Sequence, residues 1–239
     1  MSRTGRPGTI ELLTDGEIRP LGLMPRASNY TFLAEVRDGD RTILAVYKPR
    51  QGETPLWDFP EGTLCNREVA AYVLSHALGW PDVPPTVLRN GPMGPGSLQL
   101  FVEADPRQHF FTLREICLDA FMPVAAFDVL VNNADRKSGH CLRAEDGTIW
   151  MVDHGVCFST EPKLRTVIWE FAGQTVPRRQ LEDVRRVAGE LRRGHLRDSL
   201  LGLLSQGEID ATARRAESLA RRGTFPRPGR GRAYPWPPV

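Results

Sequence analysis

The sequence has little of what marks several common classes of protein. It contains four cysteines in 239 residues, and no two of them form a CxxC pair. A structural zinc site needs clustered Cys and His ligands, so this spacing predicts free, buried thiols in a reducing compartment. The four are Cys65, Cys117, Cys141 and Cys157.

Long apolar runs are also absent. No stretch approaches the roughly 20 apolar residues that cross a bilayer, so we expect no membrane insertion. The first residues, MSRTGRPGTI, lack the apolar centre of a signal peptide. Together these features predict a cytoplasmic protein.

An excess of one charge is missing as well, because 31 basic residues face 29 acidic ones. The balance gives no reason to expect nucleic acid as a partner. Arginine is nevertheless dense from residue 178 onward, and the stretch RRGTFPRPGRGRAYPWPPV has five arginines and no acid. Nucleic-acid binding through this region stays the less favoured interpretation, because acidic neighbours on the same helices pair with arginines.

The pattern of the first hundred residues is mainly that of strands. Residues 10–46 predict a meander of three strands, TIELLTDG, SNYTFLAEVRDG and DRTILAVYKPR, with a turn at Asp38-Gly39. A helix is predicted over 64–78, ending at Gly79. Two more strands joined by a Gly/Pro-rich turn follow, and a hinge is predicted at 104–106.

Beyond the hinge the pattern is helical. Thr112 and Glu115 match a capping box, which predicts a buried helix through about residue 132, kinked at Pro123. Further helices are predicted at about 178–193, 196–205 and 208–222. We therefore expect an α+β, bilobal fold with a β-rich N-lobe containing one helix (1–104) and a mainly helical C-lobe (105–222). A Pro/Arg-rich tail (223–239) is predicted to be disordered or to lie on the surface.

The most informative stretch is residues 132–155, NNADRKSGHCLRAEDGTIWMVDHG. Two β-prone runs flank Asp146-Gly147, which predicts a hairpin. A hairpin returns the chain close to its start, so Asp135 and Asp153 at its two ends can converge. Converging carboxylates bind a hard cation, or one binds the cation while the other accepts a proton. That is the chemistry of phosphoryl transfer.

Three positions in the predicted N-lobe are candidates for the same chemistry. Lys48, at the end of the strand ILAVYK, can reach phosphate oxygens in a cleft or extend into solvent. Glu68 can hold Lys48 by an ion pair or be a solvated helix residue. Ser28 and Asn29 can belong to a phosphate-covering loop, although no GxGxxG or P-loop pattern is present and an ordinary turn explains them too.

Polar residues beside the two aspartates have similar alternatives. His140 opens the hairpin and is either a cation ligand or a hydrogen-bonded structural residue. Arg136 and Lys137 can neutralise charge that develops on a phosphate, or they can be solvated.

The string DRKSGH, the hairpin and the following DHG resemble the atypical kinases that include phosphatidylinositol 3- and 4-kinases and bacterial HipA-type kinases. Those families carry an Asp-Arg-His-x-x-Asn loop, a short hairpin and then Asp-x-Gly. The chain looks like an actinobacterial branch of this group. The resemblance covers roughly residues 10–205, and residues 132–155 are its specific part.

The resemblance implies an ATP-dependent phosphotransferase of protein-kinase-like fold, with a protein or small-molecule hydroxyl as acceptor and Mg²⁺ or Mn²⁺ as cofactor. Asp135 would be the catalytic-loop carboxylate, with Arg136 and Lys137 beside it. Asp153 would be the principal metal ligand. The missing apolar docking loop argues against a phosphoinositide acceptor.

For the nucleotide, the resemblance implies that Lys48 binds phosphate and that the hinge near Glu103 meets the adenine. His140 stands where the family has its second metal ligand, an asparagine. An imidazole there favours Mn²⁺, or it means a single metal ion or no catalysis. A nucleotide-binding pseudokinase that acts through a partner protein, and an AMP-transferring protein of the same fold, therefore stay open as alternatives.

Overall fold

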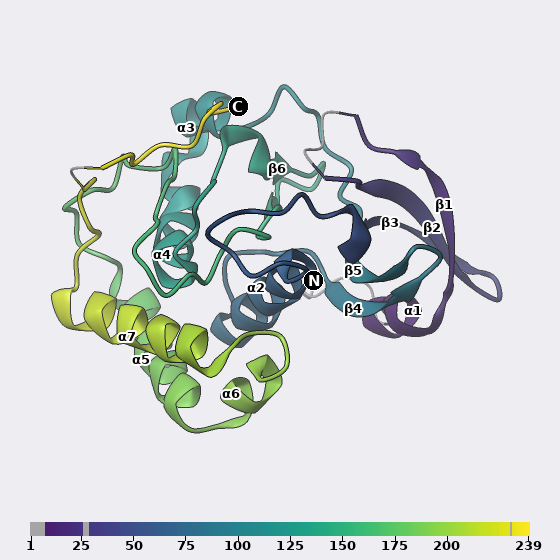
Figure 1. Ribbon diagram of the computed structural model, residues 1–239. Coiled ribbons are helices and arrows are strands. Elements are labelled where there is room, and N and C mark those ends of the chain that lie inside the picture. The colour runs from purple at the N-terminus through teal and green to yellow at the C-terminus, as the bar shows by residue number, and fades with distance from the viewer. Residues whose placement is uncertain (1–7, 26–28, 230) are drawn as a thin grey trace.

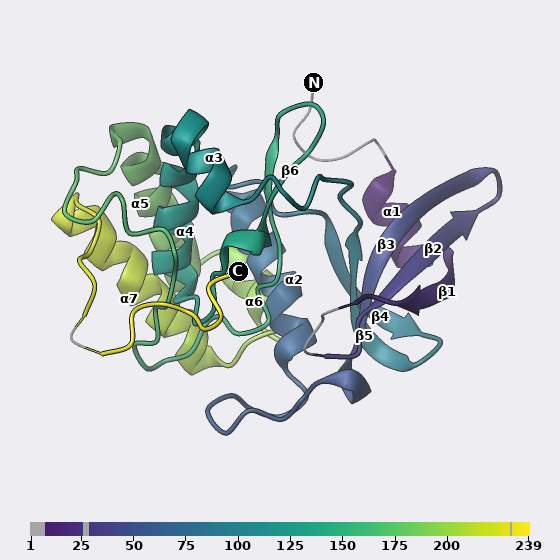
Figure 2. The ribbon, with the colours of Figure 1, turned by 90° about the horizontal axis from the view of Figure 1, so that it is seen from above.

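The computed structural model describes residues 8–25, 29–229 and 231–239, which divide into a sheet-rich half and a helical half (Figure 1). Ser28, one of the predicted phosphate-loop residues, lies outside the described residues. The short hairpin lies between the two halves when the molecule is seen from above (Figure 2). This arrangement confirms the α+β class that the sequence predicts.

The N-terminal half is built on one antiparallel sheet of five strands. These are β1 (Glu17–Leu23), β2 (Phe32–Asp38), β3 (Arg41–Pro49), β4 (Thr86–Gly91) and β5 (Gly94–Leu100), in the spatial order β1-β2-β3-β5-β4. The predicted turn at Asp38-Gly39 joins β2 to β3. Lys48 faces Ser97 of β5 in the register, so it belongs to the central strand of the sheet.

The prediction that TIELLTDG forms the first strand is wrong. Residues Thr9–Asp15 form helix α1, in which Thr9, Leu12 and Leu13 are buried at helical spacing. The first strand is β1 instead, and it contains Pro20 and Gly22, residue types that strands disfavour. It tolerates them because it is an edge strand, with a register shift between these two residues.

Helix α2 (Leu64–Leu78) has the predicted bounds. It ends at Gly79, whose φ of 79° lies in the left-handed region and whose N–H donates to the carbonyl of Ser75. A 3-10 turn, η1 (Arg50–Gly52), and a loop connect β3 to it. The buried residues Ala70, Ala71, Leu74 and Leu78 belong to the same core as the helical half. Helix α2 is therefore the element through which the two halves are packed together.

The single kinked helix predicted after the hinge is three short segments. They are α3 (Phe110–Cys117), the 3-10 turn η2 (Leu118–Phe121) and α4 (Met122–Val131). The predicted capping residue Thr112 lies inside α3, where its hydroxyl accepts the N–H of His109. Pro123 occupies the first turn of α4, where no N–H is needed, so it starts a helix and does not kink one.

The predicted hairpin is confirmed. A 3-10 turn, η3 (Ser138–His140), leads into β6 (Cys141–Arg143), which pairs with β7 (Ile149–Met151). Helices α5 (Arg178–Arg192), α6 (His195–Leu200) and α7 (Gln206–Arg222) follow, with α6 shorter than predicted.

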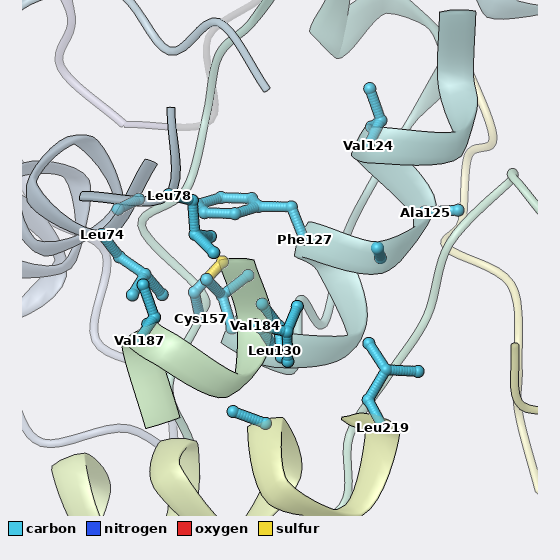
Figure 3. Packing of buried hydrophobic residues seen from close by; sticks show 14 of the residues in the cluster. Leu74, Leu78, Val124, Ala125, Phe127, Leu130, Cys157, Val184, Val187 and Leu219 are labelled. Atoms are coloured by element: carbon cyan, nitrogen blue, oxygen red, sulfur yellow. The ribbon is translucent and has the colours of Figure 1, made fainter. Parts of the chain in front are cut away.

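The core of the helical half joins residues from helices α2 to α7. Phe127 and Leu130 of α4 pack near Val184 of α5, Leu219 of α7 and Leu74 of α2 (Figure 3). Each such side chain contributes about 1.5–3 kcal/mol on burial. The helix α4 that precedes the catalytic-looking loop is therefore held on several sides.

The described residues of the tail, 223–229 and 231–239, lie against the rest of the protein. Phe225 is buried against Phe171, with ring centroids 5.6 Å apart, and its N–H donates to the carbonyl of Gln174. The last residues return toward the middle of the molecule (Figure 2). Of the two alternatives predicted for the tail, the described residues follow the one in which it lies against the protein.

Within the described part of the chain, no helix combines the length and the apolar character required to cross a membrane.

Candidate active site

A cleft of about 450 Å³ lies between the sheet and the hairpin. Residues of β3, β5, α2, the loop after α4 and the segment after β7 line it. Seven of the predicted site residues are among them: Asn29, Lys48, Glu68, Asp135, Lys137, His140 and Asp153. A slightly larger hollow of about 500 Å³ between α4 and α7 has arginines but no carboxylate or histidine in its lining, so it lacks this chemistry.

Lys48 connects the two halves across the cleft. Its ammonium forms an ion pair with Glu68 on α2, and it lies 3.0 Å from Oδ1 of Asp153. Burial lowers the pKa of Lys48, but the charges of Asp153 and Glu68 outweigh this and raise it above its usual value. The predicted ion pair is thus present, and the amine stays charged at neutral pH.

Glu68 fixes two partners with one carboxylate. The residue is 2% exposed, and while Oε1 meets Lys48, Oε2 accepts the backbone N–H of His154 at 2.9 Å. The carboxylate therefore sets the distance between the lysine and the backbone that carries Asp153.

Asp153 adopts a left-handed backbone, with a φ of 61°. Aspartate tolerates this region better than most residues, and such conformations concentrate at functional sites. Oδ1 faces Lys48, and Oδ2 lies 3.2 Å from Nε2 of His140. Lys48 holds the pKa of Asp153 well below its usual range, and the side chain is 49% exposed. An anionic carboxylate thus faces the cleft with an accessible edge.

His140 is a neutral imidazole. Burial lowers the pKa of His140 to about 4. The N–H of Lys137 donates to its Nδ1 at 3.3 Å, which places the ring proton on Nε2, toward Asp153. In this arrangement His140 donates to the aspartate. A metal bond at Nε2 requires the proton to leave that atom, so the predicted ligand role stays a prediction.

Asp135 is held by the end of α4. The N–H of Asp135 donates to Oδ1 of Asn133 at 2.9 Å, a turn in which an asparagine side chain accepts a backbone bond two residues on. Nζ of Lys137 lies 3.5 Å from its Oδ2. Burial raises the pKa of Asp135, and the charge of Asp153 adds to that, while Lys137 opposes it. A carboxylate with a raised pKa in a cleft is suited to accept a proton.

Arg136 does not face the cleft, which corrects the prediction that it acts on phosphate. Its side chain is fully buried, and its Nε donates to Asp128 at 3.1 Å. The guanidinium also donates to the carbonyl of Val152 at 2.8 Å and meets Nε2 of His154 at 2.7 Å. Arg136 is therefore a positioning residue that holds the segment leading to Asp153.

The predicted adenine contact at Glu103 is also corrected. Residues 99–102 form that wall of the cleft, whereas Glu103 is exposed and outside the lining. Asn29 does line the cleft, but its Oδ1 accepts the N–H of Thr54 at 2.8 Å. This bond already uses the amide oxygen of Asn29, so the side chain orders the loop before helix α2.

The fit of a metal ion can be judged from the donors present. Among the described residues, no three His, Cys, Asp or Glu side chains gather into a metal-binding group. Mg²⁺ at nucleotide sites is held by one or two carboxylates together with phosphate oxygens and water. Asp153 and its accessible edge fit that mode of binding.

Sequence reasoning missed two acidic residues that support the site. The Glu53 carboxylate accepts the N–H groups of Leu64 and Cys65 at the start of α2 and lines the cleft. Asp128, fully buried on α4, binds Arg136. A lone charge in the apolar segment MPVAAFDVLV was the available signal for the second, because a buried charge needs a partner. Glu53 had a weaker signal, an acid placed before a helix.

Comparison with solved structures places this architecture among kinase-like folds. The chain is similar to the Helicobacter pylori proinflammatory kinase CtkA (14% identity, TM-score 0.49, covering 89% of this chain and 94% of that one). It is also similar to hydra Fam20, solved with sugar (14% identity, TM-score 0.55, covering 89% and 86%). At this identity the likeness concerns the fold alone, and with the TM-score of 0.55 to hydra Fam20 the predicted fold class is confirmed.

Comparison with curated proteins defines the family. The chain belongs to the family of Protein Rv2133c of Mycobacterium tuberculosis, with 40% identity over 272 aligned positions, 99% of this chain and 98% of that protein. It is also similar to phosphatidylinositol 4-kinase gamma 4 of rice, with 33% identity over 128 residues, 46% of this chain and 22% of that protein. No known protein-family profile matches. The relation to HipA-type kinases stays a prediction.

Proposed function

We propose that the chain is an ATP-dependent phosphotransferase whose acceptor is a hydroxyl of a protein or a small molecule. The observation that carries the proposal is the ammonium of Lys48, which joins Glu68 on the sheet side of the cleft to Asp153 on the hairpin side. Phosphotransferases of kinase fold use a lysine held by a glutamate, with an aspartate at the metal. The likeness to a protein named phosphatidylinositol 4-kinase supports the same class of reaction.

Each residue has a role that follows from its surroundings. Lys48 would meet phosphate oxygens as a point charge, and Asp135 would accept the proton of the acceptor hydroxyl as its oxygen bonds to the γ-phosphorus and ADP leaves. Asp153 would hold Mg²⁺ or Mn²⁺, which supplies charge neutralisation at the phosphates. Lys137, 3.5 Å from Asp135, would keep that carboxylate in place.

The direct test combines binding and turnover. ATP with Mg²⁺ or Mn²⁺ should raise the melting temperature, since a ligand at 100 times its Kd stabilises the native state by about 2.7 kcal/mol. ADP release should accompany transfer to casein, to small polyols or to vesicles containing phosphatidylinositol. A chain that neither binds nor turns over ATP with either cation would exclude the function.

A nucleotide-binding pseudokinase is the second candidate, and one contact favours it. Both oxygens of Asp153 are already engaged, one by Lys48 and one by His140. His140 also stands where the atypical kinases that the chain resembles have an asparagine. Stabilisation by ATP without ADP release would support this candidate. AMP transfer is the remaining variant, and the mass of the product distinguishes it from phosphate transfer.

Replacing Glu68 by glutamine is expected to lower kcat about 10- to 100-fold. The amide has the same shape and can still accept the N–H of His154, but it cannot neutralise Lys48, so the ammonium loses its fixed position. Steady-state ADP release measures the effect, and Glu61→Gln in the exposed loop before α2 is the matched control. Equal kcat in the two variants would show that the Lys48–Glu68 pair is structural.

A further inference from the structure

The tail is anchored before it reaches the catalytic loop. Phe225 is 4% exposed against Phe171, and backbone bonds join it to Gln174 and Gly173. This anchor lies entirely within residues 223–229. The remaining described residues, 231–239, are not needed for it.

Those remaining residues contact the loop that carries Asp135. The carbonyl of Pro238 accepts the N–H of Ser138 at 2.9 Å, and Ser138 follows Asp135 by three residues. The carbonyl of Ala233 accepts the N–H of Thr166 and the indole N–H of Trp169, both at 3.1 Å. The tail thus lies along two segments that are themselves paired, because Thr166 forms a bridge with Arg136.

These hydrogen bonds between residues 231–239 and the rest of the protein run in one direction. In each of these bonds the loop or the segment 166–169 donates, and the tail accepts through a main-chain oxygen. Prolines at 235, 237 and 238 remove N–H groups from the tail, so its main chain offers mostly acceptors. The aromatic side chains of Tyr234 and Trp236 remain 54% and 77% exposed. Recognition therefore rests on main-chain oxygens of a segment that lies outside any helix or strand.

The nucleotide cleft is separate from these contacts. None of the described tail residues lines it, although Asp135, Lys137, Gly139 and His140 of the same loop do. Arg232 adds a positive charge near Asp135, which slightly opposes the rise that burial causes in the pKa of that carboxylate. The tail thus contacts the catalytic loop outside the lining of the cleft, three residues from Asp135.

We propose that the N–H groups of Ser138, Thr166 and Trp169 form a binding strip for a peptide acceptor, and that residues 231–239 occupy this strip within the same chain. The tail has to leave this strip before an acceptor reaches Asp135. That the bound peptide is a phosphate acceptor rests on the proposed function. The strip itself is a peptide-binding site that can be tested without turnover.

The main experiment uses a chain that ends at Gly229, which keeps the Phe225 anchor. A fluorescein-labelled peptide of residues 231–239 should bind this truncated chain in fluorescence anisotropy and bind the full chain at least 10-fold more weakly, because the strip is occupied there. ADP release with casein should rise at least 5-fold on truncation, with the KM for ATP unchanged. The free peptide should reverse the rise in competition with casein and not with ATP.

A point variant covers the case in which the truncated chain does not fold. Trp169→Phe removes one donor to Ala233 in the full-length chain and so loosens the tail, which should speed amide hydrogen exchange at Ser138 and at Thr166, the other two donors that the tail covers. Trp57→Phe, at a 93% exposed side chain, is the matched control and should change neither.

The outcomes separate the two proposals. No peptide binding to the truncated chain, or unchanged amide exchange at Ser138 and Thr166 in Trp169→Phe, overturns the strip, whatever the activity. A truncation that raises affinity for ATP as well as casein turnover also overturns it, since the tail would then act on the cleft. If no form of the protein turns over ATP, the proposed function fails, while peptide binding to the truncated chain alone still supports the strip.

Discussion

Asp153→Asn should reduce ADP release by about 10²–10³-fold, the usual effect of removing one electrostatic group that stabilises the transition state. Asparagine keeps the size of the side chain and tolerates the left-handed backbone at φ 61°, so the variant should fold. It loses the negative charge that faces Lys48 at 3.0 Å and that would hold the cation.

The measurement is steady-state ADP release with Mg²⁺ and with Mn²⁺, together with thermal shift by ATP. Asp146→Asn in the exposed turn of the hairpin is the matched control and should retain full activity. The metal-dependent part of the thermal shift should disappear in Asp153→Asn. Activity within twofold of the unchanged protein would show that Asp153 does not bind the metal. The phosphotransferase proposal would then lack the carboxylate that it assigns to the cation.

Asp128→Ala is expected to destabilise the protein by about 3–5 kcal/mol, because it leaves the buried charge of Arg136 without a partner. Both side chains are 0% exposed. The carboxylate accepts from Arg136 at 3.1 Å, from Asn133 at 3.0 Å and from Thr166 at 3.2 Å. Its removal therefore leaves donors on three segments unsatisfied.

Urea denaturation followed by circular dichroism measures this loss. Glu182→Ala, which breaks a pair with Arg178 whose side chains are 92% and 56% exposed, is the control and should cost no more than about 0.5 kcal/mol. A loss below about 1 kcal/mol for Asp128→Ala would show that water or a neighbour replaces the carboxylate. Because Arg136 also holds Val152, loss of activity is expected to accompany the loss of stability.

Several elements could be read from the sequence because local interactions form them. The hairpin follows from Asp146-Gly147 between two β-prone runs, and helix α2 follows from its apolar spacing and from Gly79 after its last residue. The first strand was misread for a local reason as well. Pro20 and Gly22 hide an edge strand, and α1 is too short for its spacing to stand out.

The residue types of the site were also readable, but their roles were not. Lys137 and Arg136 are neighbours with the same charge, yet the first lines the cleft and the second is buried against Asp128. Their directions depend on which segments pack around the loop. Nothing in the string DRKSGH specifies those segments.

The sequence by itself determined the hairpin, the helix α2 and the presence of two aspartates at the ends of one short excursion of the chain. Only the tertiary structure decided that Lys48 meets Glu68 and Asp153, which lie 20 and 105 residues away. It also decided that the tail returns to Ser138. The physical reason is range: turns and helices are selected by interactions over a few residues, whereas contacts between distant segments exist only after the whole core has packed.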